Sequence, residues 1–267
     1  MEEYDLVVIG GGPAGYAAAM RAIDYGKQVC LIEKNRVGGA GLYNGALSSK
    51  TLWEISQKVF NVNKFVNESD RCKFELSWIE VKKTLEEAIF ERKFQYSCHI
   101  KLLQTETINH LFHYERGAAK MLDAHTVEIK HDGELKSIKA KNIVIATGST
   151  PRKLPNLDVD EKVIFTSDGI EELTDYPKSM VIVGAGVIGC EYATIFSNLG
   201  KTKVYLIDRQ DRILPFEDKD ISDLVATNLE RNGVTIHHEA ILNRLENKNG
   251  TVEYELSYPD GSTEIIQ

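Results

Sequence analysis

Two stretches of the chain share one pattern of apolar and glycine positions. The apolar runs Leu6–Ile9 and Met180–Val183 each lead directly into a glycine-rich turn. A short apolar run bounded by such a turn predicts a strand buried on both faces, as in a parallel sheet. The helix expected after each turn ends at a glycine, Gly26 in the first copy and Gly200 in the second, at the same spacing from the turn.

A second strand follows each expected helix and closes on a carboxylate. These strands span residues 28–33 and 203–208, and they end in Glu33 and Asp208. Each copy is therefore a complete strand-helix-strand crossover, which predicts an α/β fold with parallel sheets. Three prolines, Pro151, Pro155 and Pro177, mark a linker between the copies, so we expect a first domain over 1–154 and a second over 155–267.

The residues after the first copy carry a helical pattern. Apolar residues between 52 and 60 follow helical spacing, and Ser77 with Glu80 forms a capping box that opens a long helix toward Leu103. Helices are therefore expected to dominate residues 50–105.

Strand patterns follow these helices and return at the end of the chain. Residues 126–130 and 135–139 face each other across Asp132-Gly133, which predicts an antiparallel excursion within the first domain. A further buried strand is expected over 143–146. In the second domain a helix around 221–229 ends at Asn232-Gly233, and short strands turn at Asn249-Gly250 and Asp260-Gly261.

Composition and charge narrow the class of protein. The chain has 267 residues, 42% of them hydrophobic, which is enough for two folded domains and excludes a disordered chain. With 32 Lys and Arg against 40 Asp and Glu, the net charge of −8 argues against nucleic acid or an anionic membrane as the main partner. The longest uncharged stretch, Leu6–Met20, is rich in glycine and suits neither a membrane span nor a signal peptide.

The cysteines indicate a reducing compartment. Cys30, Cys72, Cys98 and Cys190 are widely scattered and form no Cys-x-x-Cys pair. This arrangement favours buried free thiols over a disulfide framework or a metal site. We therefore expect a cytoplasmic protein without a bound metal.

Each glycine-rich turn has the G-x-G-x-x-G form of a dinucleotide-binding motif. The first contains Gly10, Gly12 and Gly15, and the second contains Gly184, Gly186 and Gly189. In this motif the first glycine permits a tight bend, the second lets the backbone approach a pyrophosphate, and the third lets the helix pack on the strand. Glycine clusters also mark ordinary loops, but the position between strand and helix favours two Rossmann-like dinucleotide-binding domains.

The carboxylates that close the second strands suit the ribose of a bound nucleotide. Glu33 and Asp208 stand where a ribose hydroxyl needs an acceptor, although either could be an ordinary strand-end carboxylate facing water. Asp208 would repel a 2′-phosphate and so favours NAD. The nearby Arg209 and Arg212 keep NADP open.

In this order, these residues resemble the FAD-dependent pyridine nucleotide-disulfide oxidoreductases, the family of dihydrolipoamide dehydrogenase and soluble transhydrogenase. The family's alanine-threonine-glycine signature is matched by Ala146-Thr147-Gly148-Ser149, and its adenine-contacting segment by Gly117-Ala118-Ala119. The resemblance implies a three-layer FAD/NAD(P)-binding fold, with FAD on the first turn and NAD, or NADP as the alternative, on the second. The residues it implies for cofactor binding are Gly10, Gly12, Pro13, Ala14, Gly15, Glu33, Lys34, Gly38, Gly39, Lys50, Ala119, Ala146, Thr147, Gly148, Ser149, Gly184, Gly186, Val187, Ile188, Gly189, Glu191 and Asp208.

The family's redox disulfide has no counterpart in this chain. The segment 38–50 resembles the family's cysteine-containing box, but Gly41 and Ala46 occupy the positions of its two cysteines. Cys30 and Cys190 are expected to be buried and so to be no substitute. Disulfide reduction by the family's route is therefore excluded.

The resemblance gives catalytic roles to Lys50 and Glu191. Lys50 matches the lysine beside flavin N5 and Glu191 the glutamate that pairs with it, so the ammonium would stabilise the charge that arrives with hydride. From the pattern alone both residues are exposed helix charges. Tyr43 and Trp53 are interpreted as core aromatics and given no role.

The sequence thus predicts an enzyme that passes hydride from NAD(P)H to FAD, and then electrons to a small-molecule acceptor that is not a disulfide. A second pyridine nucleotide and a quinone-like molecule both fit. The family's return segment and dimerisation domain are missing, so we expect part of a longer chain, weak FAD binding by this part, and a homodimer only for the longer parent. The alternatives are a nucleotide-binding module without turnover and an inert truncated product.

Overall fold

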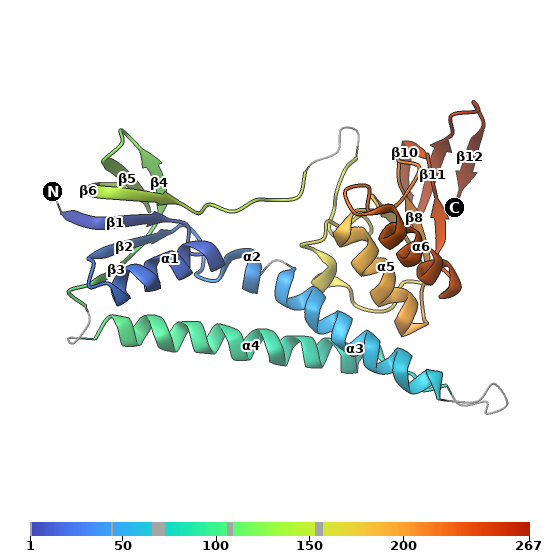
Figure 1. Ribbon diagram of the computed structural model, residues 1–267, viewed down its shortest axis with the longest axis horizontal. Helices are drawn as coiled ribbons and strands as arrows, with labels where there is room; N and C mark the ends of the chain where they lie inside the picture. The colour runs from blue at the N-terminus through green and yellow to red at the C-terminus, as the bar shows by residue number, and fades with distance from the viewer. Residues whose placement is uncertain (1, 44, 66–72, 106–108, 153–156) are drawn as a thin grey trace. The chain divides into compact units, whose positions relative to one another are not determined.

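The structure is a computed structural model, and it describes residues 2–43, 45–65, 73–105, 109–152 and 157–267 (Figure 1). It divides into two compact units, one of Met1–Leu47 with Glu87–Thr150 and one of Ser48–Glu86 with Pro151–Gln267. The predicted domains 1–154 and 155–267 differ from these units in the segment 48–86, which packs with the second unit. The predicted boundary at Pro155 lies outside the described residues.

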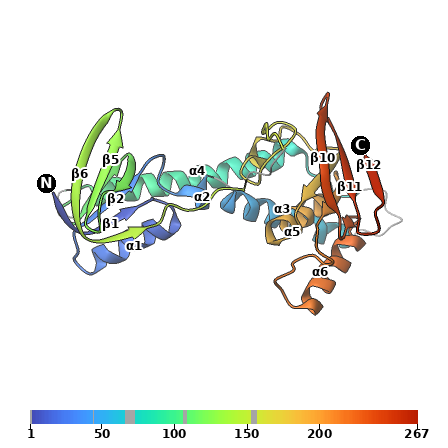
Figure 2. The same cartoon turned by 90° about the horizontal axis from the view of Figure 1, so that it is seen from above.

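The first unit is built on a six-stranded sheet in the order β3-β2-β1-β6-β5-β4. Strand β1 (Glu3–Ile9), helix α1 (Pro13–Asp24) and strand β2 (Val29–Glu33) form the predicted crossover, and β3 (Phe112–Arg116) pairs in parallel beside β2. Val8 and Leu31 are buried in the core shared with Ala19 of α1, while Val7 and Ile32 are buried on the opposite face. Burial on both faces explains the uninterrupted apolar runs, and Figure 2 shows α1 along one face.

The predicted strands 135–139 and 143–146 are one continuous strand, β6 (Glu134–Ile145). Its first half pairs antiparallel with β5 (Thr126–His131), and its second half pairs in parallel with β1. Lys139 belongs to both ladders, so the strand passes from one partner to the other without a break. The prediction of two strands was wrong. The polar residues between them mark the point where β6 changes its pairing from β5 to β1, and not a break in the strand. The predicted antiparallel excursion is confirmed, and it also contains β4 (Ala118–Met121).

The helices predicted between the two crossovers are present. They are α3 (Ala46–Lys64) and α4 (Trp78–Leu103). A short helix that was not predicted, α2 (Gly39–Leu42), precedes them. The capping box of α4 is confirmed: the backbone N–H of Ser77 donates to Glu80 Oε2 at 2.9 Å, and the N–H of Glu80 donates to Ser77 Oγ at 3.3 Å.

The second unit repeats the crossover on a smaller parallel sheet in the order β7-β8-β9. Its elements are β7 (Ser179–Val183), α5 (Val187–Leu199), β8 (Lys203–Ile207), α6 (Lys219–Arg231), β9 (Thr235–His237) and the 3-10 turn η1 (Ile170–Glu172). Helix α5 ends at Gly200, which takes the left-handed conformation with φ of 71°, as predicted. The segment 48–86 packs on this unit through Trp78, whose ring stacks 6.3 Å from that of Phe196 on α5.

A second, antiparallel sheet in this unit has the order β10-β11-β12 (Figure 2). Its strands are β10 (Ile241–Lys248), β11 (Thr251–Ser257) and β12 (Thr263–Ile266), and their turns fall at the predicted Asn249-Gly250 and Asp260-Gly261. Tyr254 and Leu256 of β11 are buried with Ile207 in one core cluster. The alternate residues of β11 face away from that core.

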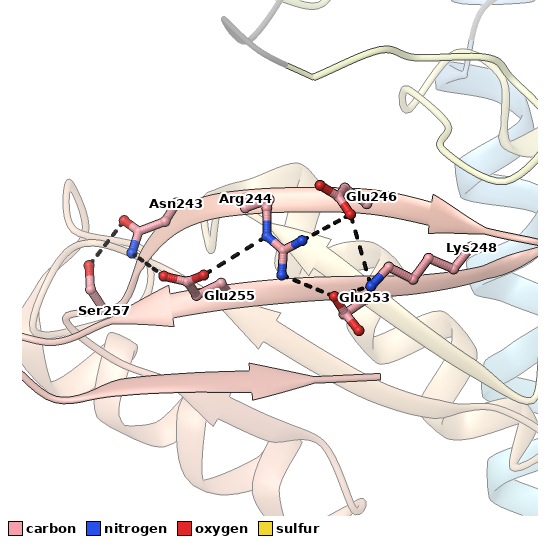
Figure 3. Close-up of polar contacts among 7 residues, drawn as sticks. All are labelled: Asn243, Arg244, Glu246, Lys248, Glu253, Glu255 and Ser257. Atoms are coloured by element: carbon pink, nitrogen blue, oxygen red, sulfur yellow. Dashed lines mark hydrogen bonds and ion pairs between the residues drawn. The ribbon is translucent and has the colours of Figure 1, made fainter.

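The outward face of this hairpin carries a network of charges (Figure 3). Arg244 on β10 contacts Glu246 at 2.9 Å and Glu253 on β11 at 3.0 Å, and Lys248 contacts Glu253 at 2.5 Å. Exposed ion pairs contribute little individually, but cross-strand pairs favour one register. The network therefore favours the observed register of β10 and β11, in which Tyr254 and Leu256 lie in the core.

The cysteine prediction is confirmed for two residues. Cys30 on β2 and Cys190 on α5 are buried free thiols. The prediction was wrong for Cys98, which lies on an exposed position of α4, and Cys72 lies outside the described residues. In the part of the chain that the structure describes, no helix is both long and apolar enough to cross a membrane.

Candidate functional site

The first glycine turn connects β1 to α1 and is closely packed. Gly10 has φ of 105°, and a Cβ atom there would lie 2.2 Å from the carbonyl oxygen of Ala146. A Cβ at Gly15 would lie 1.9 Å from the carbonyl oxygen of Gly10. At Gly12, in contrast, the nearest neighbour of a Cβ is the Cα of Gly39 at 3.9 Å. Only the second glycine of the motif therefore leaves open space, which is where the motif requires a pyrophosphate to approach.

The second turn, between β7 and α5, repeats this arrangement at its second and third glycines. Gly184 has φ of 104°, and a Cβ at Gly189 would lie 2.0 Å from the carbonyl oxygen of Gly184. No described residue lies within 4 Å of a Cβ at Gly186. Gly12 and Gly186 are the N-caps of α1 and α5, and neither helix has a side-chain cap at this end. The helix amides at both turns are thus left for an anion.

The two predicted carboxylates bind their turns in the same way. Glu33 accepts hydrogen bonds from the N–H groups of Gly11 and Asn35, both at 2.7 Å. Asp208 accepts from the N–H groups of Ala185 at 2.6 Å and Gln210 at 2.8 Å. Each acid is therefore held beside the middle of its glycine turn rather than facing water at random, and each oxygen keeps a lone pair for a ribose hydroxyl.

The structure brings most of the other predicted FAD residues to the first turn. The N–H of Gly38 donates to the carbonyl of Gly11 at 2.8 Å, and the N–H of Gly117, which opens the segment containing Ala119, donates to the carbonyl of Glu33 at 3.0 Å. Pro13 and Ala14 begin α1. Ala146 follows β6 beside Gly10, and Thr147, Gly148, Ser149 and Lys34 are exposed.

The space of the missing first cysteine is filled by a proline. A Cβ atom at Gly41 would lie 2.4 Å from Cγ of Pro13. A cysteine could not take this position without displacing the start of α1. Burial raises the pKa of the Cys30 thiol to about 12 and that of Cys190 to about 11, so neither is a ready thiolate.

Lys50 and Glu191 form an ion pair within the second unit. The Nζ of Lys50 on α3 lies 2.5 Å from Oε1 of Glu191 on α5. The Lys50 side chain is 68% exposed and that of Glu191 15% exposed. The sequence alone would make both residues independent surface charges; the fold pairs them, as the resemblance implies.

A shallow cavity of about 560 Å³, open to solvent, lies beside this pair, entirely within the second unit. It is lined from α3 by Lys50 and Trp53, from α5 by Val187 and Glu191, and from α6 by Ile221. The interpretation of Trp53 as core was wrong: its side chain is 44% exposed, because Leu52, Ile55 and Val59 define the buried face of α3. Ile188, predicted to contact the nucleotide, is also exposed. Tyr43 is half-buried between Arg36 and Lys93.

A family model for pyridine nucleotide-disulphide oxidoreductases matches residues 4–266. The chain belongs to this family. The match confirms the resemblance, the α/β fold class and the assignment to an oxidoreductase family, and this family uses FAD and a pyridine nucleotide.

Among its relatives are soluble pyridine nucleotide transhydrogenases. That of Colwellia psychrerythraea is 35% identical over 254 residues, which cover 94% of this chain and 53% of the relative. That of Azotobacter vinelandii is 37% identical over 247 residues, which cover 91% and 51%. The chain thus spans about half the length of these relatives.

Solved structures share the fold. LpdA of Mycobacterium tuberculosis aligns with a TM-score of 0.82 at 22% identity, over 99% of this chain and 57% of its own. The copper(II) complex of the HOCl-induced flavoprotein disulfide reductase RclA of Escherichia coli aligns with a TM-score of 0.79 at 24% identity, over 99% and 55%.

Proposed function

We propose that the protein binds FAD on its first glycine turn and a pyridine nucleotide on its second, and that hydride passes from the nucleotide to the flavin. The observation that carries this proposal is the repeated site: at both turns the second glycine is open, the helix amides are uncapped, and a carboxylate is held beside the turn. Family membership supports the same two cofactors.

The residues present fit both groups. Gly10, Gly12, Gly15 and Glu33 would hold the adenosine diphosphate part of FAD, with Ala119 near Glu33 through the Gly117 hydrogen bond. Gly184, Gly186, Gly189 and Asp208 would hold the pyridine nucleotide. The bound flavin supplies two-electron redox chemistry.

Lys50 would place its positive charge near the reducing end of the flavin. The 2.5 Å contact with Glu191 favours one orientation of the ammonium, which would lower the cost of orienting it when charge develops. Its 68% exposure leaves the ammonium accessible from the cavity.

NAD is favoured over NADP at the second turn. Asp208 uses one oxygen for Ala185 and the other for Gln210, so both oxygens stand at the turn where a 2′-phosphate would add negative charge. Arg212 donates to the carbonyl of Pro215 at 2.9 Å, which engages one of its nitrogens away from the nucleotide. Arg209 is the cation that would still admit NADP.

The electrons would leave the flavin for an acceptor other than a disulfide. Gly41 and Ala46 carry no sulfur, and the buried Cys30 and Cys190 do not replace them. A second pyridine nucleotide is favoured because the relatives are transhydrogenases, and a quinone-like molecule is the other candidate. The cytoplasmic location and a homodimer of a longer parent stay predictions.

Anaerobic rapid mixing tests this function. We expect the protein with excess FAD to lose flavin absorbance when NADH is added, and to recover it when NADP⁺ or a quinone is then added. NADH binding without loss of absorbance would instead support a nucleotide-binding module, and absence of binding would support an inert product. The thiol titre should stay constant throughout turnover.

A further inference from the structure

Trp53 is an exposed aromatic residue that lines the cavity beside Lys50 and Glu191. It lies on α3, one turn after Lys50, with 44% of its side chain exposed. Val187 and Ile221, which line the cavity from α5 and α6, are 67% and 51% exposed. A large aromatic and two aliphatic side chains therefore leave apolar surface around one ion pair in an open cavity, whose lining also includes Glu217. Apolar walls with a few polar groups are typical of ligand sites.

The other tryptophan shows what a structural role looks like in this unit. Trp78 is buried, its indole N–H donates to the carbonyl of Leu173 at 2.8 Å, and its ring contacts Tyr176 edge-on at 5.0 Å. Within the described part of the chain, the Trp53 indole has no comparable ring or hydrogen-bond partner. Packing therefore accounts for Trp78 and leaves the orientation of Trp53 toward the cavity unexplained.

The cavity adjoins the second glycine turn. Val187, which lines it, directly follows Gly186, the open glycine and N-cap of α5. A nucleotide with its pyrophosphate at this helix end and its adenosine ribose at Asp208 has its nicotinamide half left to enter the cavity. Because that half ends in a flat ring, an indole face is a suitable contact for it.

We propose that Trp53 is a positioning residue whose indole stacks on the nicotinamide ring and holds it beside the Lys50–Glu191 pair. This inference rests on the proposed function, since it takes a pyridine nucleotide as the occupant of the second turn. Stacking of a base-like ring on an aromatic side chain changes affinity by roughly 5- to 150-fold. The partial exposure of Trp53 places the expected effect near the lower end, about tenfold.

Calorimetric titration of three ligands tests the role of Trp53. NADH contains both halves of the nucleotide, reduced nicotinamide mononucleotide contains only the ring half, and ADP-ribose lacks the ring. We expect Trp53→Ala to weaken NADH and the mononucleotide about tenfold and to leave ADP-ribose unchanged. Trp53→Phe keeps an aromatic face and should lose only about twofold.

The matched control is Phe65→Ala, which removes an aromatic that is 87% exposed just beyond the end of α3 and outside the cavity. It should change none of the three affinities. Equal NADH affinity in Trp53→Ala and the parent would overturn the inference while the proposed function stands. If Trp53→Ala lost as much affinity for ADP-ribose as for NADH, the inference would also be overturned, because Trp53 would then have a structural role. Failure of the parent protein to bind NADH and ADP-ribose would instead overturn the proposed function itself.

Discussion

The two glycine turns have nearly the same internal geometry, but they differ in how closely other segments of the chain pack against them. The first glycines have φ of 105° and 104°, and a Cβ added at the third glycines would lie 1.9 and 2.0 Å from the carbonyl oxygen of the first. A Cβ added at Gly10 would lie 2.2 Å from the carbonyl oxygen of Ala146, however, whereas apart from its chain neighbours no described residue comes within 4 Å of a Cβ at Gly184. The turn and its acid are thus set by local sequence, and the packing around them by distant segments. The two levels can be separated by substitution.

The largest expected difference is between Gly10→Ala and Gly184→Ala. Both place a side chain at positive φ, which costs about 1–3 kcal/mol. Only Gly10→Ala also drives a Cβ into the Ala146 carbonyl, which adds about 1–3 kcal/mol. Denaturant unfolding should therefore show a loss of about 4 kcal/mol for Gly10→Ala and about half of that for Gly184→Ala.

Gly26→Ala is the control for this comparison, because Gly26 has φ of 65° and no described neighbour within 4 Å of a Cβ. It should behave like Gly184→Ala. Equal losses at Gly10 and Gly184 would mean that Ala146 does not press on the first turn.

The third glycines should show no difference between the copies. In Gly15→Ala and Gly189→Ala the new Cβ would lie 1.9 and 2.0 Å from the carbonyl oxygens of Gly10 and Gly184, so each helix must move away from its own turn. We expect similar losses of about 2–3 kcal/mol in the free energy of unfolding, measured by the same denaturant titration. Losses that differ by more than about 1 kcal/mol would contradict the conclusion that the two turns share one internal geometry.

The carboxylates should separate the two nucleotides. In Glu33→Gln or Asp208→Asn, one of the two backbone N–H donors faces an amide NH₂ group, and the acceptor for the ribose is weakened. Glu33→Gln should weaken FAD roughly tenfold and leave NADH unchanged, and Asp208→Asn should do the reverse. Fluorescence titration measures the affinities for FAD and NADH. A loss of NADH affinity in Glu33→Gln, or of FAD affinity in Asp208→Asn, would contradict two separate sites.

The smallest expected effect is a local loss of stability around Asp160 at low pH. Asp160 in the second unit accepts hydrogen bonds from the N–H groups of Lys162, Val163 and Ile164, which lower its pKa to about 2. A carboxyl with a lowered pKa stabilises the fold above its ordinary value of 3.8 and loses that contribution as the pH falls toward 2. The protection of the amides of residues 162–164, measured as their exchange rate relative to that of an unstructured peptide at the same pH, should therefore fall between about pH 4 and 2. In Asp160→Ala these three amides should have low protection at every pH.

Local patterns were enough to predict both turns, their acids and most strands. The glycines and carboxylates are read within one crossover, where the backbone itself fixes their geometry. The single strand β6 was missed because its two halves pair with different strands. Trp53 was wrongly assigned to the core because it directly follows the buried Leu52, yet points from α3 toward the cavity. The contact between Pro13 and Gly41 joins residues far apart in the sequence, and only the fold shows it.

Binding of FAD and NADH to Gly12→Ala and Gly186→Ala tests the central claim most directly. Both glycines have extended backbone and open space for a Cβ, so both variants should unfold like the parent protein. Equilibrium titration should show that Gly12→Ala loses FAD and keeps NADH, and that Gly186→Ala loses NADH and keeps FAD. Retention of both nucleotides in either variant, or loss of both in one, would contradict two separate phosphate sites.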